Sequence, residues 1–417
     1  MRAILGVTVA AGALALAGCG GADAEAGAVW AGTIEDSAGV SMVTSSADGF
    51  WTDETRWQIE DVLRIGEAEG DPDYQFGLIS GIAELSDGRI MVLDQQAQNV
   101  RIFSPAGVIE QTAGKAGSGP GEFGQGAAWL NVTRGDTVFV LDQGNQRVSR
   151  LLGDGSFDGS FPIDFQTSGF PVRVEARPSG SLIAQFRVIQ FPGQDRESGD
   201  AILELAGDGT VLDTTRTMES GGTFKMKDGR PEFLLFAAEP SWSLMGEDEL
   251  VFATNDRYRL ETYGPDGALR RVISRPSDEV PVTDEDRNAF MEGMEKAWAR
   301  FGMPDAQIEQ LKSQMNFADV FPVFNQFRAG PSGSVWVQRL MTPTELVALE
   351  GEINLQGGGN LGGPDWDVFD SEGRLMGQVM MPDKYRLVSF TGDKILGVWR
   401  DEFDVQYVRI LRVVQPS

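Results

Sequence analysis

The chain has 417 residues, enough for one large domain or for two or three ordinary ones. It carries 62 Asp and Glu against 35 Lys and Arg, so its formal net charge is −27, and we expect no nucleic-acid partner. The absence of histidine excludes Ser-His-Asp and Cys-His catalysis and His-ligated zinc, and a single cysteine excludes an intramolecular disulfide. The 52 glycines favour a turn-rich β protein over a helical one.

The N-terminus is typical of a secretion signal followed by a membrane anchor. Arg2 precedes the apolar run Ile4–Leu16, which has the length of a signal-peptide core and is too short to span a bilayer. The run ends in Leu16-Ala17-Gly18-Cys19, which resembles the bacterial lipobox, in which the cysteine is lipidated. The alternative is an ordinary secretory signal with an incidental cysteine. We therefore expect a signal peptide over residues 1–18, then lipidated Cys19 and a flexible tether over residues 19–40.

This N-terminus also predicts where the protein is located. No later stretch is apolar for the roughly 18 residues that a membrane-spanning helix needs. We expect the mature protein in the cell envelope of a bacterium with two membranes, attached by the lipid on Cys19 and facing the periplasm or the cell surface.

From about residue 41 onward the chain repeats a pattern of two strands. Residues 86–107 and 134–155 each contain a turn, a β-branched strand that ends in Leu-Asp, a polar turn, a second strand and a Gly turn. Gly88 and Gly135 are 47 residues apart, which fits one four-stranded propeller blade. Weaker copies start near residues 179, 246, 332 and 391, which makes six. Because the last copy reaches the C-terminus, we expect residues 56–65 to complete the last blade and close the ring.

The segment between the first two copies carries a more specific signal. Gly114–Phe123, with the sequence GKAGSGPGEF, resembles the linker between blades of NHL-type propellers, and so does the DGRIMVLD pattern of residues 87–94. From residue 41 to 417 the chain resembles the bacterial six-bladed β-propeller lipoproteins of the NHL-repeat-like superfamily. The resemblance implies an all-β fold, a six-bladed β-propeller with four-stranded blades.

Two insertions interrupt the repeats. In residues 277–320, Thr283 and Asp286 form a start like a capping box, and Phe290, Met294, Trp298 and Phe301 recur at helical spacing. Gly302 ends this helix and Pro304 begins a second, so we expect a helical hairpin. It either packs on the rim of the propeller or forms a lid or docking arm over the channel. Residues 341–363 are Gly-rich toward their end and predict a mobile loop.

Ligands of propellers usually bind at a mouth of the channel, so we aligned the residues that end the second strand of each blade. These are Asp94, Asp142, Arg187, Asn255, Arg339 and Arg400. The three arginines suggest an anionic ligand at this mouth, because a guanidinium binds carboxylate, phosphate or sulfate through two hydrogen bonds. Alternatively, the two aspartates brace their own turns and the arginines pair with acids of neighbouring blades.

Aromatic residues in the later copies allow two interpretations. Trp336, Trp366 and Trp399 either stack on a sugar or peptide or, as is more usual, pack between blades.

From these features we expect a module that binds or scaffolds a protein, peptide or glycan. The alternative is a hydrolase or lyase assisted by Ca²⁺ in the channel, because the chain is rich in the oxygen ligands that Ca²⁺ prefers. The sequence contains no spaced Ca²⁺ loop, so we assign no metal ligand, and it singles out no catalytic residue. A purely structural envelope protein is a third interpretation.

Overall fold

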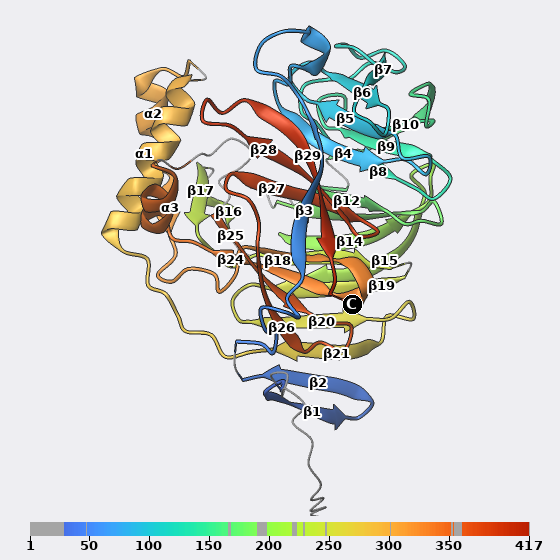
Figure 1. Cartoon of the computed structure of the whole chain (residues 1–417). Coiled ribbons are helices and arrows are strands. Elements are labelled where there is room, and N and C mark those ends of the chain that lie inside the picture. Colours follow the sequence, from blue (N-terminus) through green and yellow to red (C-terminus); the bar gives the residue numbers. More distant parts are fainter. Residues whose placement is uncertain are drawn as a thin grey trace, which may run out of the picture.

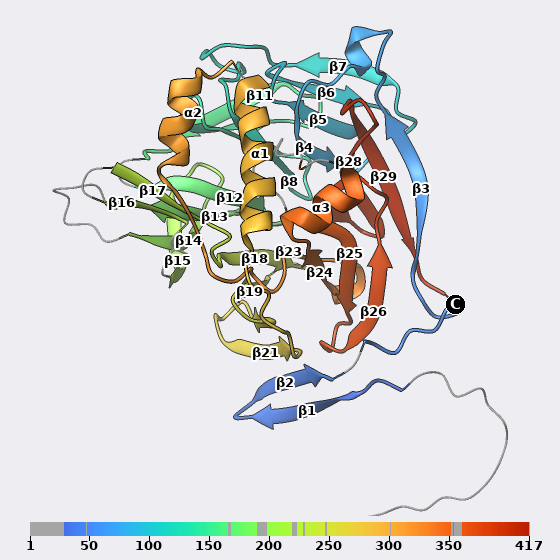
Figure 2. The same ribbon diagram turned by 90° about the vertical axis from the view of Figure 1, so that its left-hand side faces the viewer.

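Six blades of antiparallel strands surround a central channel in the computed structural model of the chain (Figures 1 and 2). The structure describes residues 29–46, 48–165, 168–189, 198–218, 223–227, 230–246, 248–300, 302–351, 353 and 361–416. The predicted six-bladed β-propeller with four-stranded blades is therefore confirmed. The predicted signal peptide and Cys19 lie outside the described residues.

The first three blades follow one another along the chain, each running from the channel outward. Blade one comprises β4 (Ile79–Glu84), β5 (Ile90–Asp94), β6 (Asn99–Phe103) and β7 (Ile109–Ala113). Blade two comprises β8 (Ala127–Val132), β9 (Val138–Asp142), β10 (Arg147–Leu151) and β11 (Phe157–Pro162). Blade three comprises β12 (Phe170–Ala176), β13 (Leu182–Val188), β14 (Gly199–Leu205) and β15 (Val211–Met218).

Blades four to six complete the ring. Blade four comprises β18 (Pro240–Met245), β19 (Glu249–Thr254), β20 (Arg259–Tyr263) and β21 (Leu269–Ser274). Blade five comprises β23 (Gln326–Ala329), β24 (Val335–Leu340), β25 (Gly362–Phe369) and β26 (Leu375–Met380). Blade six comprises β27 (Tyr385–Thr391), β28 (Lys394–Arg400), β29 (Gln406–Val414) and β3 (Gln58–Ile65). Short 3₁₀ turns cover Pro72–Tyr74 and Pro331–Gly333.

Every pair of neighbouring blades shares a hydrophobic cluster, including blades six and one. The second strands β5 and β9 are buried along their whole length, because a neighbouring blade covers each of their faces. This explains why their sequences run apolar instead of alternating. Trp336 and Trp366 are almost completely buried in the cluster between blades five and six, and Trp399 packs against it. These tryptophans thus pack between blades, which was the more usual of the two roles expected from the sequence.

The ring closes by combining strands from both ends of the chain. β3 pairs antiparallel with the C-terminal strand β29, with Leu63 opposite Ile410 (Figure 1). The side-chain Oε1 of Gln406 then accepts a hydrogen bond from the backbone N–H of Ile79 at 2.8 Å, which joins blade six to blade one. The prediction that residues 56–65 complete the last blade is confirmed.

The N-terminal hairpin departs from the prediction of a flexible tether up to residue 40. β1 (Gly32–Ser37) pairs with β2 (Val40–Ser45), and β2 adds parallel to β21 at the outer edge of blade four. Val43 is fully buried there, and the Ser45 hydroxyl accepts a hydrogen bond from the backbone N–H of Leu375. The burial of Val43 and the ladder to β21 order this segment, which composition alone did not reveal.

The first insertion forms the predicted helices and also an unexpected strand. α1 (Asp284–Arg300) begins with the predicted cap, in which the Thr283 hydroxyl donates to the Asp286 carboxylate and accepts from the backbone N–H of Asp286. α2 (Asp305–Lys312) follows. β22 (Met315–Phe317) then pairs parallel with β17 (Arg230–Leu235), which also pairs with β16 (Phe224–Lys227). Because this small sheet pairs segments that are far apart in sequence, no local sequence pattern predicts it.

The second insertion contains a helix where a mobile loop was predicted. α3 (Pro343–Glu350) has a capping box of Thr342 and Glu345, proline at its first position and Gly351 at φ 82° after its end. These are standard helix signals that the Gly-rich continuation obscured. Residues 352 and 354–360 lie outside the described part of the chain. Figure 2 shows α1 and α3 on one face of the ring.

Candidate functional site: an arginine-lined channel cavity

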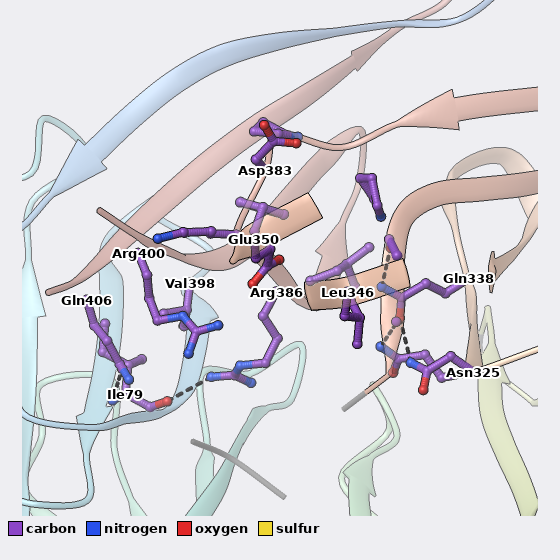
Figure 3. Close-up of a pocket in the computed structure, with 18 of the residues that line it drawn as sticks. Ile79, Asn325, Gln338, Leu346, Glu350, Asp383, Arg386, Val398, Arg400 and Gln406 are labelled. Atoms are coloured by element: carbon purple, nitrogen blue, oxygen red, sulfur yellow. Dashed lines mark hydrogen bonds between the residues drawn. The ribbon is translucent and has the colours of Figure 1, made fainter. Parts of the chain in front are cut away.

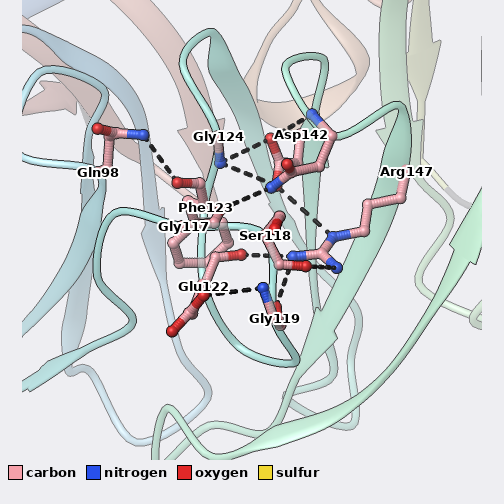
Figure 4. Close-up of polar contacts among 10 residues, drawn as sticks. Gln98, Gly117, Ser118, Gly119, Glu122, Phe123, Gly124, Asp142 and Arg147 are labelled. Carbon is pink, nitrogen blue, oxygen red and sulfur yellow. Dashed lines mark hydrogen bonds and ion pairs between the residues drawn. The ribbon is translucent and has the colours of Figure 1, made fainter.

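The two aspartates that end second strands serve the turns of their own blades. Asp142 is completely buried and accepts hydrogen bonds from the backbone N–H groups of Gly124 and Asn145 and from the Asn145 side chain (Figure 4). Asp94 likewise accepts from the backbone of residues 77, 78, 96 and 97. Each carboxylate, at the end of a second strand, thus binds the backbone of the segment that leads into the first strand of the same blade.

Arg147, which lies beside Asp142, binds the linker that precedes blade two. The Arg147 guanidinium lies 3.6 Å from Asp142 and donates to the carbonyl oxygens of Ser118, Gly119 and Glu122 (Figure 4). The predicted linker Gly114–Phe123 therefore joins blades one and two, as expected, and its backbone is bound by side chains of blade two.

Arg187 and Asn255 join blades to one another. Arg187 forms ion pairs with Asp200 at 2.8 Å and with Glu239 at 2.5 Å. Although burial opposes its charge, these two carboxylates raise the pKa of Arg187. The Asn255 amide accepts from the backbone of Glu239 and donates to the carbonyl of Phe324, which links blades four and five. The ion pair of Arg187 with Glu239 is the kind of contact between blades that the alternative interpretation expected for the arginines.

The last two of the six aligned residues, Arg339 and Arg400, lie in different surroundings. Arg339 is half exposed and pairs with Glu345 of the α3 cap at 2.8 Å. Arg400 lines a cavity of about 560 Å³ at one end of the channel. None of the other five aligned residues is in the wall of this cavity.

The cavity receives two further arginines from the innermost strands of its blades. Arg328 belongs to β23 and Arg386 to β27, and both line the cavity beside Arg400. Figure 3 shows the Arg386 and Arg400 guanidiniums next to each other. Arg328 also lines a second cavity of about 840 Å³, which extends to the turns between first and second strands at the other end of the channel. Arg328 therefore lies where the two cavities meet.

These arginines form no ion pair with any residue that the structure describes. Arg386 donates to the carbonyl oxygen of Ile79 at 2.9 Å, and Arg328 donates to that of Phe327 at 2.8 Å. The Nε of Arg328 is buried without a hydrogen-bond partner among the described residues. Elsewhere in the channel, Arg173 is paired with Glu175. The cavity thus gathers three arginines that have no ion pair among the described residues, although the carboxylates of Glu350 and Asp383 also line it.

The pKa values of Arg328 and Arg386 are lowered in this arrangement. Burial, and then the positive charge of Arg173, lower the pKa of Arg328 to about 9. Burial, and then the charge of Arg400, lower the pKa of Arg386 to about 10. Both guanidiniums remain charged at neutral pH, but each is held there against desolvation and like-charge repulsion. An anion in the cavity would relieve both costs.

One acidic residue of the second insertion lies over the cavity. Glu350, the last residue of α3, lines it together with Leu346 and Leu349 of the same helix (Figure 3). Burial raises the pKa of Glu350, and the charges of Arg400 and Lys384 oppose this rise without a direct ion pair.

The first insertion supports α3 instead of lining the cavity itself. Asp286 of α1 accepts hydrogen bonds from the backbone and hydroxyl of Thr344, and Phe290 packs in one cluster with Leu346.

Sequence reasoning missed Arg328 and Arg386 because it examined the ends of second strands. The available signal was an arginine between apolar neighbours in the first strand of a blade, as in Phe327-Arg328-Ala329 and Tyr385-Arg386-Leu387. Since strand residues alternate between faces, such an arginine points away from the apolar packing of its neighbours and toward the channel.

The described residues contain neither a metal-binding cluster nor a membrane-spanning helix. No group of three or more Asp, Glu, Cys or His side chains within them is arranged to hold a metal ion. None of the helices in this part of the chain is both long and apolar enough to cross a membrane.

Fold and cavity together define a six-bladed β-propeller with an arginine-lined channel mouth. A family model described as a 6-bladed beta-propeller matches residues 69–177. Among solved structures, a member of the DUF4221 family from Bacteroides vulgatus is similar with a TM-score of 0.53 and 11% identity, covering 87% of this chain and 99% of that one. A protein of Bacteroides fragilis described as exported has a TM-score of 0.51 and 11% identity, covering 90% and 100%.

Virginiamycin B lyase from Staphylococcus aureus is more distant, with a TM-score of 0.41 and 12% identity, covering 86% of this chain and 100% of that one. The comparison with curated proteins gives no match. At such low identities the structural likenesses establish the propeller fold alone.

Proposed function

We propose that this protein is an extracytoplasmic, lipid-anchored β-propeller that binds an anionic ligand in the channel cavity of Arg328, Arg386 and Arg400. The observation that carries the proposal is the lack of carboxylate partners for these three arginines among the described residues, in a chain with 62 acids and 35 bases. Where acids so outnumber bases, an arginine in a folded core is easily paired. A cluster left unpaired in a cavity is best explained by a ligand that supplies the negative charge.

The proposed location rests on the N-terminal sequence, and the likeness to a protein described as exported agrees with it. Cys19→Ser should release the protein from the membrane fraction into the soluble envelope fraction. Retention of the Cys19→Ser protein in the membrane would contradict lipid anchoring at this residue.

The anion site can be tested by thermal unfolding of the full mature protein in sulfate, phosphate and chloride at equal ionic strength. A ligand at about 100 times its Kd stabilises the folded state by about 2.7 kcal/mol. We expect sulfate or phosphate to raise the melting temperature relative to chloride, and Arg386→Gln to abolish the rise. Arg339→Gln is the matched control, because that arginine lies outside the cavity, and it should keep the rise. Equal melting temperatures in all salts would contradict the proposal.

A further inference from the structure

The cavity offers more than positive charge, and its other walls indicate what kind of anion it takes. One wall consists of amides. The Gln338 Oε1 accepts hydrogen bonds from Asn325 at 2.8 Å and from Gln326 at 2.7 Å, and its Nε2 donates to the carbonyl of Gly363. This network fixes the orientation of the three amides at the cavity wall (Figure 3). Oriented amides are suited to hydroxyl groups, which both donate and accept.

A second wall is aromatic and apolar. Trp129 lies in β8 at a bulge, where residue 130 and not 129 pairs with β9, and its backbone has φ 49°. A bulky residue in this left-handed conformation is strained, and such strain persists where the surroundings hold it. The Trp129 side chain packs against the cluster between blades two and three and also lines the cavity. Leu346, Leu349 and Ile353 add further apolar surface.

The size of the cavity argues against an inorganic anion as its natural ligand. Cavities of roughly 300–1,000 Å³ hold drug-sized organic ligands, and this one measures about 560 Å³. Sulfate or phosphate would pair with the arginines but has no apolar face to pack on Trp129. A ligand that uses all three walls needs a negative group, several hydroxyls and an apolar face.

We propose that the ligand is an acidic sugar of the uronic-acid class, as a free sugar or within a glycan. Its carboxylate would bind Arg386 and Arg400, its hydroxyls the amides of Asn325, Gln326 and Gln338, and a face of its ring would pack on Trp129. This inference rests on the proposed anion site and narrows its ligand. A sugar ring presents C–H groups on one face and hydroxyls at its edge, so one ligand in the channel can contact both Trp129 of blade two and the amides of blade five.

The test is calorimetric titration of the full mature protein with a panel of uronate disaccharides and their neutral counterparts. The panel comprises digalacturonate, diglucuronate and dimannuronate, each with the corresponding neutral hexose disaccharide. We expect at least one uronate to bind at least tenfold more tightly than its neutral counterpart and than sulfate. Gln326→Met should weaken uronate binding about tenfold and leave the melting-temperature shift in sulfate unchanged, because it removes the amide but not the charge.

The possible outcomes separate this inference from the anion site itself. If sulfate or phosphate stabilises the protein and no uronate binds better than these ions, the sugar assignment is overturned and the anion site stands. If an Asp-Glu oligopeptide binds more tightly than every uronate, the sugar assignment also fails. If no anion binds at all, the proposed function falls with it. Trp129→Leu, checked by circular dichroism for folding, should lower uronate affinity and spare the sulfate effect.

Discussion

At the level of single residues, buried charge has two distinct uses in this propeller. Asp94 and Asp142 are buried and surrounded by hydrogen-bond donors of their own blades, so their charge stabilises turns. Arg386 and Arg400 line a cavity without carboxylate partners among the described residues, so their charge is available to a ligand. Buried aspartates thus stabilise turns, and we propose that the channel arginines bind a ligand.

The structural role of Asp142 predicts a large loss of stability on its removal. Asp142→Ala leaves the buried N–H groups of Gly124 and Asn145 and the Arg147 guanidinium without their acceptor, which should cost about 3 kcal/mol. Urea unfolding of the mature protein measures this change. Asp158→Ala, which removes only a partly exposed ion pair with Arg150, should cost less than about 1 kcal/mol. Equal losses in the two variants would show that Asp142 has no special role.

At the level of elements, α3 lines the same cavity as the arginines. It begins with a capping box, is fastened to α1 through Asp286 and Thr344, and ends with Glu350 over the cavity. The first insertion therefore contacts α3 through α1 and does not itself line the cavity. Of the apolar stripe that the sequence revealed in α1, Phe290 and Met294 share a cluster with Leu346, so this part of the stripe contacts the other insertion.

Glu350 should oppose an anionic ligand, and this predicts a variant with increased affinity. Glu350→Gln removes a negative charge near Arg400 and should strengthen sulfate binding about three- to tenfold, in line with roughly 1 kcal/mol for a partly solvated charge. Glu345→Gln, on the same helix but paired with Arg339 away from the cavity, is the control. Sulfate affinities follow from the concentration dependence of the melting temperature. Unchanged affinity in Glu350→Gln would contradict the placement of its charge.

The same residue gives the binding a pH dependence. Because burial raises the pKa of Glu350, it takes up a proton at a higher pH than an ordinary glutamate and then ceases to repel the anion. Sulfate keeps its charge in this range, so its affinity should rise as pH falls from 7 to 5. The charged groups facing Glu350 are Arg400, Lys384, Asp383 and Asp404. In Glu350→Gln the affinity should vary less over this range, whereas an unaltered pH profile would assign the titration to another group.

At the level of the whole molecule, the ring depends on β3. This strand comes from the N-terminal part of the chain and pairs with β29 along its length, so that blade six contains both ends of the propeller. The β1–β2 hairpin, in contrast, adds only to the outer edge of blade four. Closure through β3 also leaves blade six without an exposed edge at β29.

Two truncations separate these roles. A chain that begins at residue 48 loses the hairpin and should still fold, with a lower melting temperature, because Val43 and Ser45 contribute buried contacts. A chain that begins at residue 67 also loses β3, exposes the β29 edge and the cluster beneath it, and should aggregate or melt much earlier. Size-exclusion chromatography and thermal unfolding distinguish them. Equal behaviour of the two chains would show that β3 does not hold the ring closed.

The sequence by itself determined the number of blades, the closing strand, and the helices of the first insertion. These features follow from local patterns: runs such as Ile90–Asp94 bounded by Gly turns, and the cap of Thr283 with Asp286, specify structure over a few residues. Of the six positions predicted to end second strands, Asp94, Asp142 and Arg400 are the last residues of β5, β9 and β28. The other three, Arg187, Asn255 and Arg339, are each one residue away from the end of their strand.

Only the tertiary structure decided which arginines meet in a cavity. Arg339 and Arg400 occupy similar positions in their strands, yet one pairs with Glu345 and the other faces the channel. Arg328 and Arg386 join Arg400 from different blades, and Glu350 reaches them from an inserted helix. Whether a charge is paired depends on neighbours that the ring brings together from distant parts of the chain. No local pattern contains that information, because blades contact one another only once the propeller is closed.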